Sequence, residues 1–311
     1  MNDQEFQNYL HQQIKSLHGS SGLTKIYKGY SSDQKFIVEK DGEKYLLKSF
    51  ALSELESKQI EFDALIHMKQ LDVICSRPLE FGTIDQAGIG YMLLTYMEGA
   101  EATDELPNYS SAIQYTIGVE AGKELAKMHK WQAPAEMASW YDRKLAKHKQ
   151  YVKAYLNGEV RIKHDEKFLS FIEQNLPLMK DRPSVFQHDD FHVGNLIVQD
   201  EKLSGVIDFN RLDFGDPVHD FLKLGMFSSE VSIPFATGQI KGYHGEHEPD
   251  ELFWKLYSLY LAMTIISSIV WILKVKSEEL PIMIEKLERV LNDHDYFNQI
   301  VPRWYVKEQQ R

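Results

Sequence analysis

The stretch FQHDDFHVGNLIVQDEKLSGVIDFNRLDFGDP, residues 186–217, decides how the rest of the chain is interpreted. Asp190 lies five residues before Asn195, and two short apolar runs, NLIV and LSGVI, then predict a β-hairpin that ends at Asp208. Such a hairpin brings Asn195 and Asp208 to neighbouring strand ends. Carboxylate and amide oxygens are the ligands that Mg²⁺ prefers. We therefore expect a Mg²⁺ site at Asn195 and Asp208 beside a carboxylate, Asp190, that orients or deprotonates a hydroxyl, which are the parts that move a γ-phosphoryl group.

The order of these motifs resembles the aminoglycoside phosphotransferase family, a group of small-molecule kinases that includes choline kinase-like enzymes. The family's loop carries a His-x-Asp-x4-Asn motif followed by Ile-Asp-Phe, and this chain has HDDFHVGN at residues 188–195 and IDF at residues 207–209. The runs GDP at 215–217 and DF at 220–221 match the family's usual sequel. One departure is Asp189, because the family most often has Gly there. The resemblance covers nearly the whole chain.

This resemblance implies an ATP- or GTP-dependent kinase that transfers the γ-phosphate to a hydroxyl of a small molecule. Asp190 would be the catalytic base, Asn195 and Asp208 would bind Mg²⁺, and His188 would orient the loop. From the sequence itself, Asp216 is expected to cap the helix that follows it. We expect an aminoglycoside-like or other amino or sugar compound as acceptor, with macrolides, choline, homoserine and thioribose as alternatives. A role in antibiotic resistance is implied with the first of these.

The flanking sequence predicts an α+β chain with two lobes, and the resemblance implies a protein-kinase-like fold. Strand patterns dominate residues 1–97 and helical patterns dominate residues 98–311, with a hinge at about 95–99. The resemblance assigns nucleotide binding to the first lobe, and catalysis and substrate binding to the second. The expected strands of the first lobe are residues 24–30, 34–40, 43–50, 79–83 and 90–97, and the first expected helices of the second are residues 110–130, 140–157 and 165–179.

Two local signals predict element boundaries in the first lobe. Asp41-Gly42 stands between two strand patterns and is a strong hairpin signal. Ser53 followed by Glu56 fits a capping box at the start of a helix over residues 53–70.

Lys48 is the expected phosphate-binding lysine of the first lobe. It lies in the apolar strand YLLKSF, residues 45–50, where a free surface lysine fits poorly. Such a lysine can reach nucleotide phosphates and be held by a helix glutamate. We expect Glu61 to be this partner, because the Glu-Phe-Asp-Ala-Leu run that it begins resembles the family's equivalent helix, with Glu56 as the alternative. A strand lysine that only extends its ammonium to solvent is the structural alternative.

Two loops compete to cover the phosphates. Residues 28–33 lie between two strands and resemble the family's Lys-Gly-x-Ser segment, whereas residues 19–22 have more glycine but follow a helix. We favour the first loop, since small residues let backbone N–H groups approach oxyanions closely. In kinase-like folds the linker between the lobes also contacts the purine through its backbone. The residues expected to bind nucleotide in this loop and in the linker are Gly29, Ser31, Ser32, Thr95 and Met97.

Composition limits the partners and the compartment. The 46 acidic and 35 basic side chains leave a net charge of −11, which argues against nucleic acid as a partner. Cys75 is the only cysteine, so an intramolecular disulfide and a multi-cysteine metal cluster are excluded. The N-terminal residues lack the pattern of a signal peptide, so we expect a cytoplasmic location. Residues 256–273 carry no charge, but their hydroxyl side chains and flanking lysines favour a core helix over a membrane span.

The acceptor-binding residues are the least determined. Residues 98–311 hold 33 acidic and 25 basic side chains, so most of the negative excess lies in the lobe expected to hold the acceptor, which favours a cationic compound. The same acids could instead form a solvated surface. The two candidate clusters are Glu98, Glu101, Asp104 and Glu105, and Glu246, Glu248, Asp250 and Glu251.

Two other classes of function compete with the kinase. His188, Asp190 and His192 could be the ligands of a metallohydrolase. A nucleotide-binding protein without catalysis is the second alternative, and the intact set of Lys48 and the three loop residues Asp190, Asn195 and Asp208 argues against it.

Overall fold

The computed structural model describes residues 2–27 and 33–308 and divides the chain into two compact units. The N-terminal unit is Met1–Gly99 with Ser204–Asn210, and the C-terminal unit is Ala100–Leu203 with Arg211–Arg311. The first boundary lies two residues after the expected one. Ser204–Asn210 joins the N-terminal unit because the N–H of Val206 donates a backbone hydrogen bond of 2.9 Å to Ile74.

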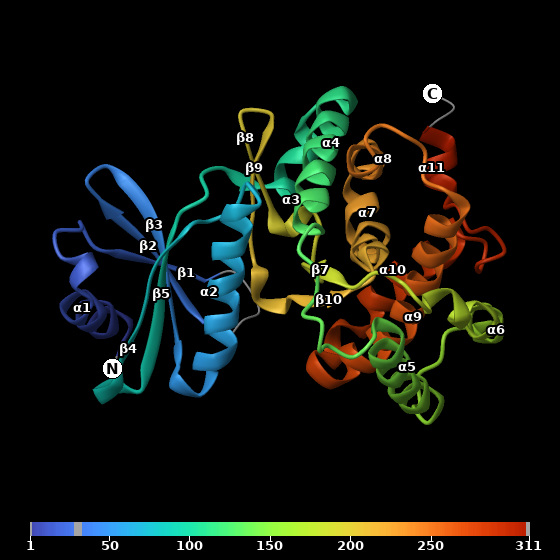
Figure 1. Ribbon diagram of the computed structural model, residues 1–311, viewed down its shortest axis with the longest axis horizontal. Coiled ribbons are helices and arrows are strands. Elements are labelled where there is room, and N and C mark those ends of the chain that lie inside the picture. The colour runs from blue at the N-terminus through green and yellow to red at the C-terminus, as the bar shows by residue number, and fades with distance from the viewer. Residues whose placement is uncertain (1, 28–32, 309–311) are drawn as a thin grey trace. The chain divides into compact units, whose positions relative to one another are not determined.

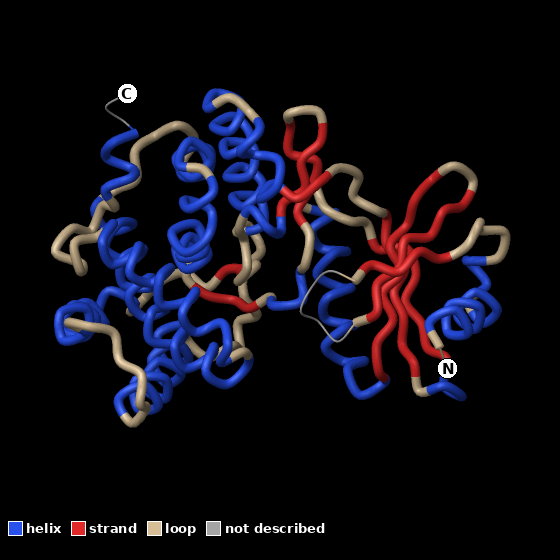
Figure 2. The backbone as a smooth tube through the Cα atoms, turned by 180° about the vertical axis from the view of Figure 1, so that it is seen from behind, coloured by secondary structure: helices blue, strands red, loops and turns tan. Residues whose placement is uncertain are grey.

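The N-terminal unit is an antiparallel five-stranded sheet with one helix on each face (Figures 1 and 2). The strand order is β1-β2-β3-β5-β4. The predicted hairpin at Asp41-Gly42 is confirmed, because Lys40 pairs with Glu43 and the turn residues have φ values of 54° and 82°. The elements are α1 Asp3–Gln13, β1 Leu23–Ile26, β2 Gln34–Lys40, β3 Glu43–Ala51, α2 Leu55–Gln70, β4 Pro78–Ile84 and β5 Ile89–Thr95.

The two faces of this sheet have different chemistry. On the α1 face, Leu10 and Leu47 belong to one fully buried apolar cluster. Because side chains alternate along a strand, the next residue, Lys48, faces α2. Phe50 faces α2 as well, since its ring and the ring of Phe62 on α2 both pack on Phe81, at centroid distances of 5.8 and 5.3 Å.

The predicted capping box at Ser53 and Glu56 is wrong. Leu52–Glu54 forms a 3₁₀ turn, and α2 begins only at Leu55 with Glu54 as its N-cap and no side-chain hydrogen bond. The 3₁₀ turn already supplies backbone partners to the first turn of the helix, so the Ser53 hydroxyl is not needed there.

The C-terminal unit is mainly helical, with short strands that frame its central loops. This arrangement and the N-terminal sheet confirm the predicted α+β fold class. The helices expected at 110–130, 140–157 and 165–179 are present as α4, α5 and α6. The elements are β6 Ala100–Glu101, α3 Ala102–Glu105, α4 Ser111–Met128, α5 Trp140–Leu156, α6 Asp165–Asn175, β7 Val185–Gln187, β8 Leu196–Gln199, β9 Lys202–Val206, β10 Asp213–Gly215, α7 Ser229–Val231, α8 Ile233–Tyr243, α9 Glu251–Val275, α10 Leu280–Asp293 and α11 Arg303–Glu308.

Helices α4 and α8 pack with their backbones in close contact. Each helix carries two glycines four residues apart, Gly118 and Gly122 on α4 and Gly238 and Gly242 on α8. A Cβ atom at Gly122 would lie 2.1 Å from the carbonyl oxygen of Gln239, and the other three glycines face backbone at similarly short distances. These glycines therefore set the separation of the two helices, whose C-terminal ends carry the hydrogen-bonded residues His129 and Tyr243.

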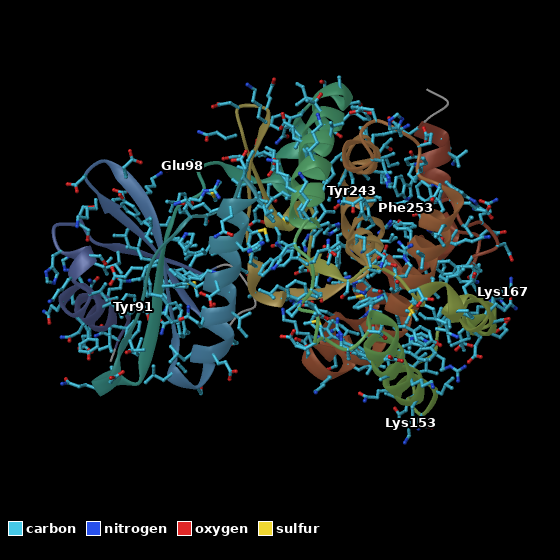
Figure 3. All side chains as sticks on the ribbon, viewed as in Figure 1. Tyr91, Glu98, Lys153, Lys167, Tyr243 and Phe253 are labelled. Carbon is cyan, nitrogen blue, oxygen red and sulfur yellow. The ribbon has the colours of Figure 1, made fainter. Side chains whose placement is uncertain are left out.

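The apolar stretch at 256–273 forms most of α9. Among the described residues, α9 alone is long and apolar enough to cross a membrane, but 67% of its most apolar window is buried inside the protein. Its N-terminal turn joins an aromatic cluster, in which Phe221 packs edge-on against Tyr243 and Phe253 at centroid distances of 4.9 and 5.1 Å (Figure 3). This burial supports the core-helix interpretation.

Candidate active site

Lys48 and Glu61 form a buried ion pair in the N-terminal unit. Lys48 Nζ lies 2.6 Å from Glu61 Oε1, and the two side chains are 6% and 2% exposed. Lys58, one turn before Glu61 on α2, contacts the other carboxylate oxygen at 3.5 Å and also pairs with Asp33. The predicted pairing of Lys48 with Glu61 is thus confirmed, and Glu56 is not the partner.

Both members of this pair remain charged despite their burial. Burial alone would lower the pKa of Lys48, but the carboxylates of Glu61, Asp208 and Asp33 outweigh it and raise that pKa. Burial would likewise raise the pKa of Glu61, yet Lys48 and Lys58 lower it. The same interactions place the carboxylate of Asp208 in the field of Lys48, inside the N-terminal unit.

The two candidate phosphate loops differ in what the structure describes. Gly29, Ser31 and Ser32 lie outside the described residues. The competing residues 19–22 lie on the α1 face, where Ser21 and Gly22 line a cavity of about 340 Å³ together with side chains of α1. Lys48 faces α2 on the opposite side of the sheet. A cover for phosphates bound by Lys48 therefore does not come from residues 19–22.

In the linker, Thr95 already has two bonds to Arg77. The backbone N–H of Thr95 donates to the Arg77 carbonyl at 2.9 Å, and its hydroxyl accepts from the Arg77 N–H at 2.8 Å. The N–H of Thr95 is therefore engaged with Arg77, and the contact of Thr95 with a purine stays a prediction. The side chain of Met97 packs against Gly205, where a Cβ atom would lie 2.1 Å from the methionine methyl.

The loop of residues 188–192, where the sequence predicts the catalytic base, joins β7 to the 3₁₀ turn Val193–Asn195. Its backbone is held by Asp220, which is fully buried and accepts hydrogen bonds from the N–H groups of His188 and Asp189 at 2.9 and 2.8 Å. Asp220 Oδ2 also lies 3.1 Å from Nε2 of His129, whose other ring nitrogen is 2.8 Å from the Tyr243 hydroxyl (Figure 3). One buried carboxylate thus fixes the loop on the helical core.

The carboxylate of Asp190 lies beside two cationic side chains, Lys223 and Arg211, and one histidine, His192. Its Oδ1 lies 2.7 Å from Nζ of Lys223 and 3.6 Å from Nε2 of His192, and its Oδ2 lies 3.7 Å from Arg211. Burial would raise the pKa of Asp190, but Lys223, with His192 and Arg211, lowers that pKa to about 2. Asp190 is therefore an ionised carboxylate with a defined orientation.

Asp189 has a different environment. Its φ of 58° explains why glycine is usual here in the resembled family, and Asp is one of the few other residues that tolerate this backbone conformation. Its Oδ1 lies 3.4 Å from Nδ1 of His219, whose Nε2 is 2.6 Å from Nζ of Lys144. Burial and the nearby carboxylate of Asp220 raise the pKa of Asp189. The two adjacent carboxylates are therefore unlike, and only Asp190 pairs directly with a lysine.

His188 and Asp216 are buried parts of the scaffold. The His188 ring is fully buried and packs edge-on against Phe191 at 5.8 Å. Asp216 caps the segment Pro217–Phe221 by accepting from Val218 N–H at 3.0 Å, as predicted, although this segment is 3₁₀ rather than α-helical. The same carboxylate accepts from Arg182 at 2.7 Å, so it also ties the segment to the rest of the unit.

Asn195 and Asp208 carry oxygens that fit a hard cation. Asn195 donates its amide to the carbonyl oxygen of Asp190 at 2.9 Å, which leaves its own Oδ1 as the free end of the side chain. Oδ1 of Asp208 is buried and has no hydrogen-bond partner among the described residues. An orphaned carboxylate oxygen and an amide oxygen are the donors that Mg²⁺ prefers.

The metallohydrolase alternative is not supported. Within residues 2–27 and 33–308, no three His, Cys, Asp or Glu side chains are grouped so that they could hold a metal ion. The ring of His192 instead packs on the ring of Phe227 in a tilted arrangement, with the centroids 4.9 Å apart, and accepts from the N–H of Gly194 at 3.0 Å. It is a packed histidine with its pKa lowered by burial to about 4.

The acid clusters of the C-terminal unit have structural partners. Asp250 is the N-cap of α9, and Glu251 pairs with Lys255 at 2.7 Å one turn later. Glu248 accepts from the Tyr305 hydroxyl at 2.8 Å, and Glu246 accepts from the Tyr115 hydroxyl at 3.2 Å. In the other cluster, Glu98 pairs with Lys44 within the N-terminal unit and Glu105 accepts from Tyr109. These contacts explain the acids without any acceptor.

The sequence interpretation did not foresee the residues that hold the loop, which are Asp220, Lys223 and the His219–Lys144 pair. Asp220 is recognisable in retrospect only as part of the DF run after GDP. Lys223 has no comparable signal, since a single lysine in a mixed helical segment is ordinary.

Comparison with known proteins gives a consistent result. The sequence model of the phosphotransferase enzyme family, APH, matches residues 22–255. An aminoglycoside 3'-phosphotransferase of Niallia circulans is 24% identical over 254 residues, which are 80% of this chain and 90% of the relative.

Solved structures show the same fold at low identity. A GDP complex of an aminoglycoside 2'-phosphotransferase-IIIa variant superposes with a TM-score of 0.73 at 13% identity, covering 96% of this chain and 100% of the other. A gentamicin complex of APH(2")-IIa gives 0.64 at 18% identity, covering 93% and 97%. A ternary complex of APH(4)-Ia with ADP and hygromycin B gives 0.68 at 12% identity, covering 92% and 97%.

Proposed function

The chain belongs to the APH phosphotransferase enzyme family and is therefore an enzyme that transfers phosphate to a hydroxyl of a small molecule, and we propose that Asp190 is its catalytic base. The observation that carries this assignment is the placement of Asp190. Asp220 fixes the N–H groups of the two preceding residues, His188 and Asp189, and the carboxylate of Asp190 is ionised and held by Lys223. Asp189, its neighbour, is instead directed to His219.

The main task of Asp190 would be to orient the attacking hydroxyl of the acceptor. Phosphoryl transfer passes through a loose transition state, so a catalytic carboxylate chiefly aligns the attacking hydroxyl and takes its proton as the new bond forms. A carboxylate with a pKa of about 2 is a weak base but a fully ionised hydrogen-bond acceptor at neutral pH. This fits alignment of a hydroxyl better than early deprotonation.

We assign nucleotide binding to the N-terminal unit and catalysis to the C-terminal unit. Lys48, fixed by Glu61, would contact the phosphates of ATP or GTP, and two of the structural relatives named above were solved with ADP or GDP. Gly29, Ser31, Ser32, Thr95 and Met97 stay as proposed nucleotide contacts. A cytoplasmic location suits an enzyme that uses a nucleoside triphosphate and whose single cysteine, Cys75, is buried and forms no disulfide.

Mg²⁺ is the cofactor that the donor set favours. Asn195 and Asp208 would hold it through their side-chain oxygens. When bound, it would offset negative charge on the phosphate oxygens.

For the acceptor, we propose an aminoglycoside-like compound first. The support is the 24% identical relative, named an aminoglycoside 3'-phosphotransferase, and the structural relatives solved with gentamicin or hygromycin B. A specific observation favours a second candidate, a hydroxy compound with a carboxylate such as homoserine. Lys144 and Lys223 bring two ammonium groups close to the catalytic loop, where a cationic acceptor would meet like charge.

The test is a screen for acceptor-dependent release of ADP or GDP with Mg²⁺. Aminoglycosides, macrolides, choline, homoserine and thioribose would each be offered, with Asp190→Ala as the blank. We expect at least one hydroxyl compound to raise nucleotide turnover in the wild type and not in the variant. Equal turnover in wild type and Asp190→Ala with every compound would refute Asp190 as the catalytic base.

A further inference from the structure

Lys223 is the strongest polar contact of the catalytic carboxylate. It lies between the 3₁₀ segment Pro217–Phe221 and the π-helical segment Leu224–Ser228. Its Nζ is 2.7 Å from Oδ1 of Asp190, and both side chains are only 16% exposed. The contacts of His192 and Arg211 with the same carboxylate are about 1 Å longer.

The protein holds the lysine in place without help from Asp190. Its chain neighbours Leu222 and Leu224 are 3% and 0% exposed, so the backbone on both sides is anchored in the core. Its ammonium lies 5.6 Å from the centre of the Phe227 ring, and that ring packs at a tilt on the ring of His192, 4.9 Å between centroids. The lysine is therefore presented to the loop by a rigid, apolar support.

One short segment fixes two different parts of the loop. Asp220 accepts from two loop N–H groups and so fixes the backbone of the loop. Lys223, three residues later, reaches the carboxylate at the end of the Asp190 side chain. A residue held at its backbone can still rotate about its side-chain bonds, and the contact with Lys223 removes that freedom.

We propose that Lys223 is a positioning residue, which occupies Oδ1 of Asp190 and leaves Oδ2 to accept the hydrogen bond of the acceptor hydroxyl. This inference rests on the proposed function of Asp190. Enzymes accelerate phosphoryl transfer largely by aligning the attacking group. Misplacement of a reacting group by about 1 Å can lower the rate about 100-fold. Lys223 thus acts on the reaction only through Asp190.

The experiment is a double-mutant cycle on the release of phosphate from radiolabelled ATP with Mg²⁺, in which water serves as the acceptor. We expect Lys223→Met to lower kcat about 10- to 100-fold and to leave KM for ATP within about twofold. In an Asp190→Ala background the same change should have no further effect, because the group that it positions is gone. Lys223→Arg should recover part of the loss, since it keeps the charge.

Lys286 supplies the matched control. Its ammonium lies 5.1 Å from the same Phe227 ring, but it pairs with Glu230 and not with Asp190. Lys286→Met should keep kcat within about twofold, and all the variants should melt close to the wild-type temperature.

Three outcomes separate the claims. If Asp190→Ala keeps full activity, the proposed base is wrong. If Asp190→Ala loses activity but Lys223→Met does not, or if Lys286→Met loses as much, only the positioning role is overturned. If the losses of Lys223→Met and Asp190→Ala are additive, Lys223 acts on the nucleotide or on the fold and is not a positioning residue for Asp190.

Discussion

In each unit the ammonium of a lysine lies within 2.7 Å of a carboxylate that matters for the proposed reaction. In the N-terminal unit Lys48 lies 2.6 Å from Glu61, and in the C-terminal unit Lys223 lies 2.7 Å from Asp190. The first pair is 6% and 2% exposed, whereas both members of the second are 16% exposed. In the first pair, which is the more buried, the glutamate holds the lysine in place. In the second pair, which is more exposed, the lysine holds the carboxylate in place.

The two lysine–carboxylate distances are nearly the same, but the working residue of the pair differs between the units. In the first pair the glutamate is the support and the lysine is the working group. In the second pair the lysine is the support and the aspartate is the working group. This reading predicts which member of each pair is needed for activity and which is needed for stability.

The largest expected effect is on nucleotide use. Lys48→Met should lower kcat/KM for ATP about 100- to 1000-fold, because it removes a cation proposed to contact the phosphates. Lys58→Met is the matched control, since Lys58 contacts the same Glu61 from α2 but faces Asp33. Steady-state kinetics with varied ATP measures both. Equal losses in the two variants would mean that Glu61, not Lys48, is the feature that matters.

The next effect is on stability and should be confined to one unit. Glu61→Gln leaves a buried ammonium without its charged partner and should lower the unfolding free energy of the N-terminal unit by about 3 kcal/mol. Lys223→Met, which breaks a pair that water can reach, should cost less than about 1 kcal/mol.

The tryptophans allow the two units to be followed separately. All five, Trp131, Trp140, Trp254, Trp271 and Trp304, belong to the C-terminal unit. In urea, Glu61→Gln should shift the transition seen by far-UV circular dichroism and leave the tryptophan-fluorescence transition in place. A shift of both transitions together would show that the units unfold as one, which would break the comparison.

The last effect is a dependence of the unfolding free energy of the C-terminal unit on pH. His294 is fully buried, and burial lowers its pKa to about 4 from an ordinary value near 6.5. Between about pH 4 and pH 6.5, the unfolded chain therefore binds a proton at His294 that the folded chain does not bind. Stability should be nearly constant above about pH 7 and should fall by about 3 kcal/mol on acidification to pH 4.

Fluorescence-monitored urea unfolding at several pH values measures this effect. His294→Gln should remove the part of the pH dependence that His294 causes and leave the part caused by other buried histidines of the unit, such as His148 and His192, whose pKa burial also lowers to about 4. His11 in the N-terminal unit is part-buried and bonds the Ser20 hydroxyl, so His11→Gln should leave the dependence unchanged. A wild-type stability that is level between pH 7 and 4 would contradict the account of His294.

The same comparison explains what could be predicted from the sequence. Lys48 and Glu61 lie on a strand and a helix, so period-two and period-3.6 patterns place them on facing surfaces. Asp190 lies in a loop, and only the motif around it predicts its role. Neither a periodic pattern nor a motif predicts the role of Lys223. Its contact with Asp190 depends on the path of two irregular segments, which no local sequence pattern determines.

The two local signals in the first lobe differed in how well they predicted the structure. Asp41-Gly42 specified a hairpin correctly, because positive φ at both turn positions admits few other residues. Ser53 and Glu56 matched a capping box, but the chain formed a 3₁₀ turn instead and began the helix two residues later. Several backbone solutions satisfy a helix N-terminus, so the cap signal was less specific than the turn signal.

The identity of the catalytic carboxylate can be tested by comparing Asp190→Asn with Asp189→Asn. Both changes remove one charge from neighbouring positions of the same loop and keep the shape of the side chain. Acceptor-stimulated release of ADP, or release of phosphate to water, should fall about 1000-fold or more in Asp190→Asn and no more than about 10-fold in Asp189→Asn. The opposite ranking would assign the chemistry to Asp189, with its contact to His219, and would contradict the mechanism proposed for this enzyme.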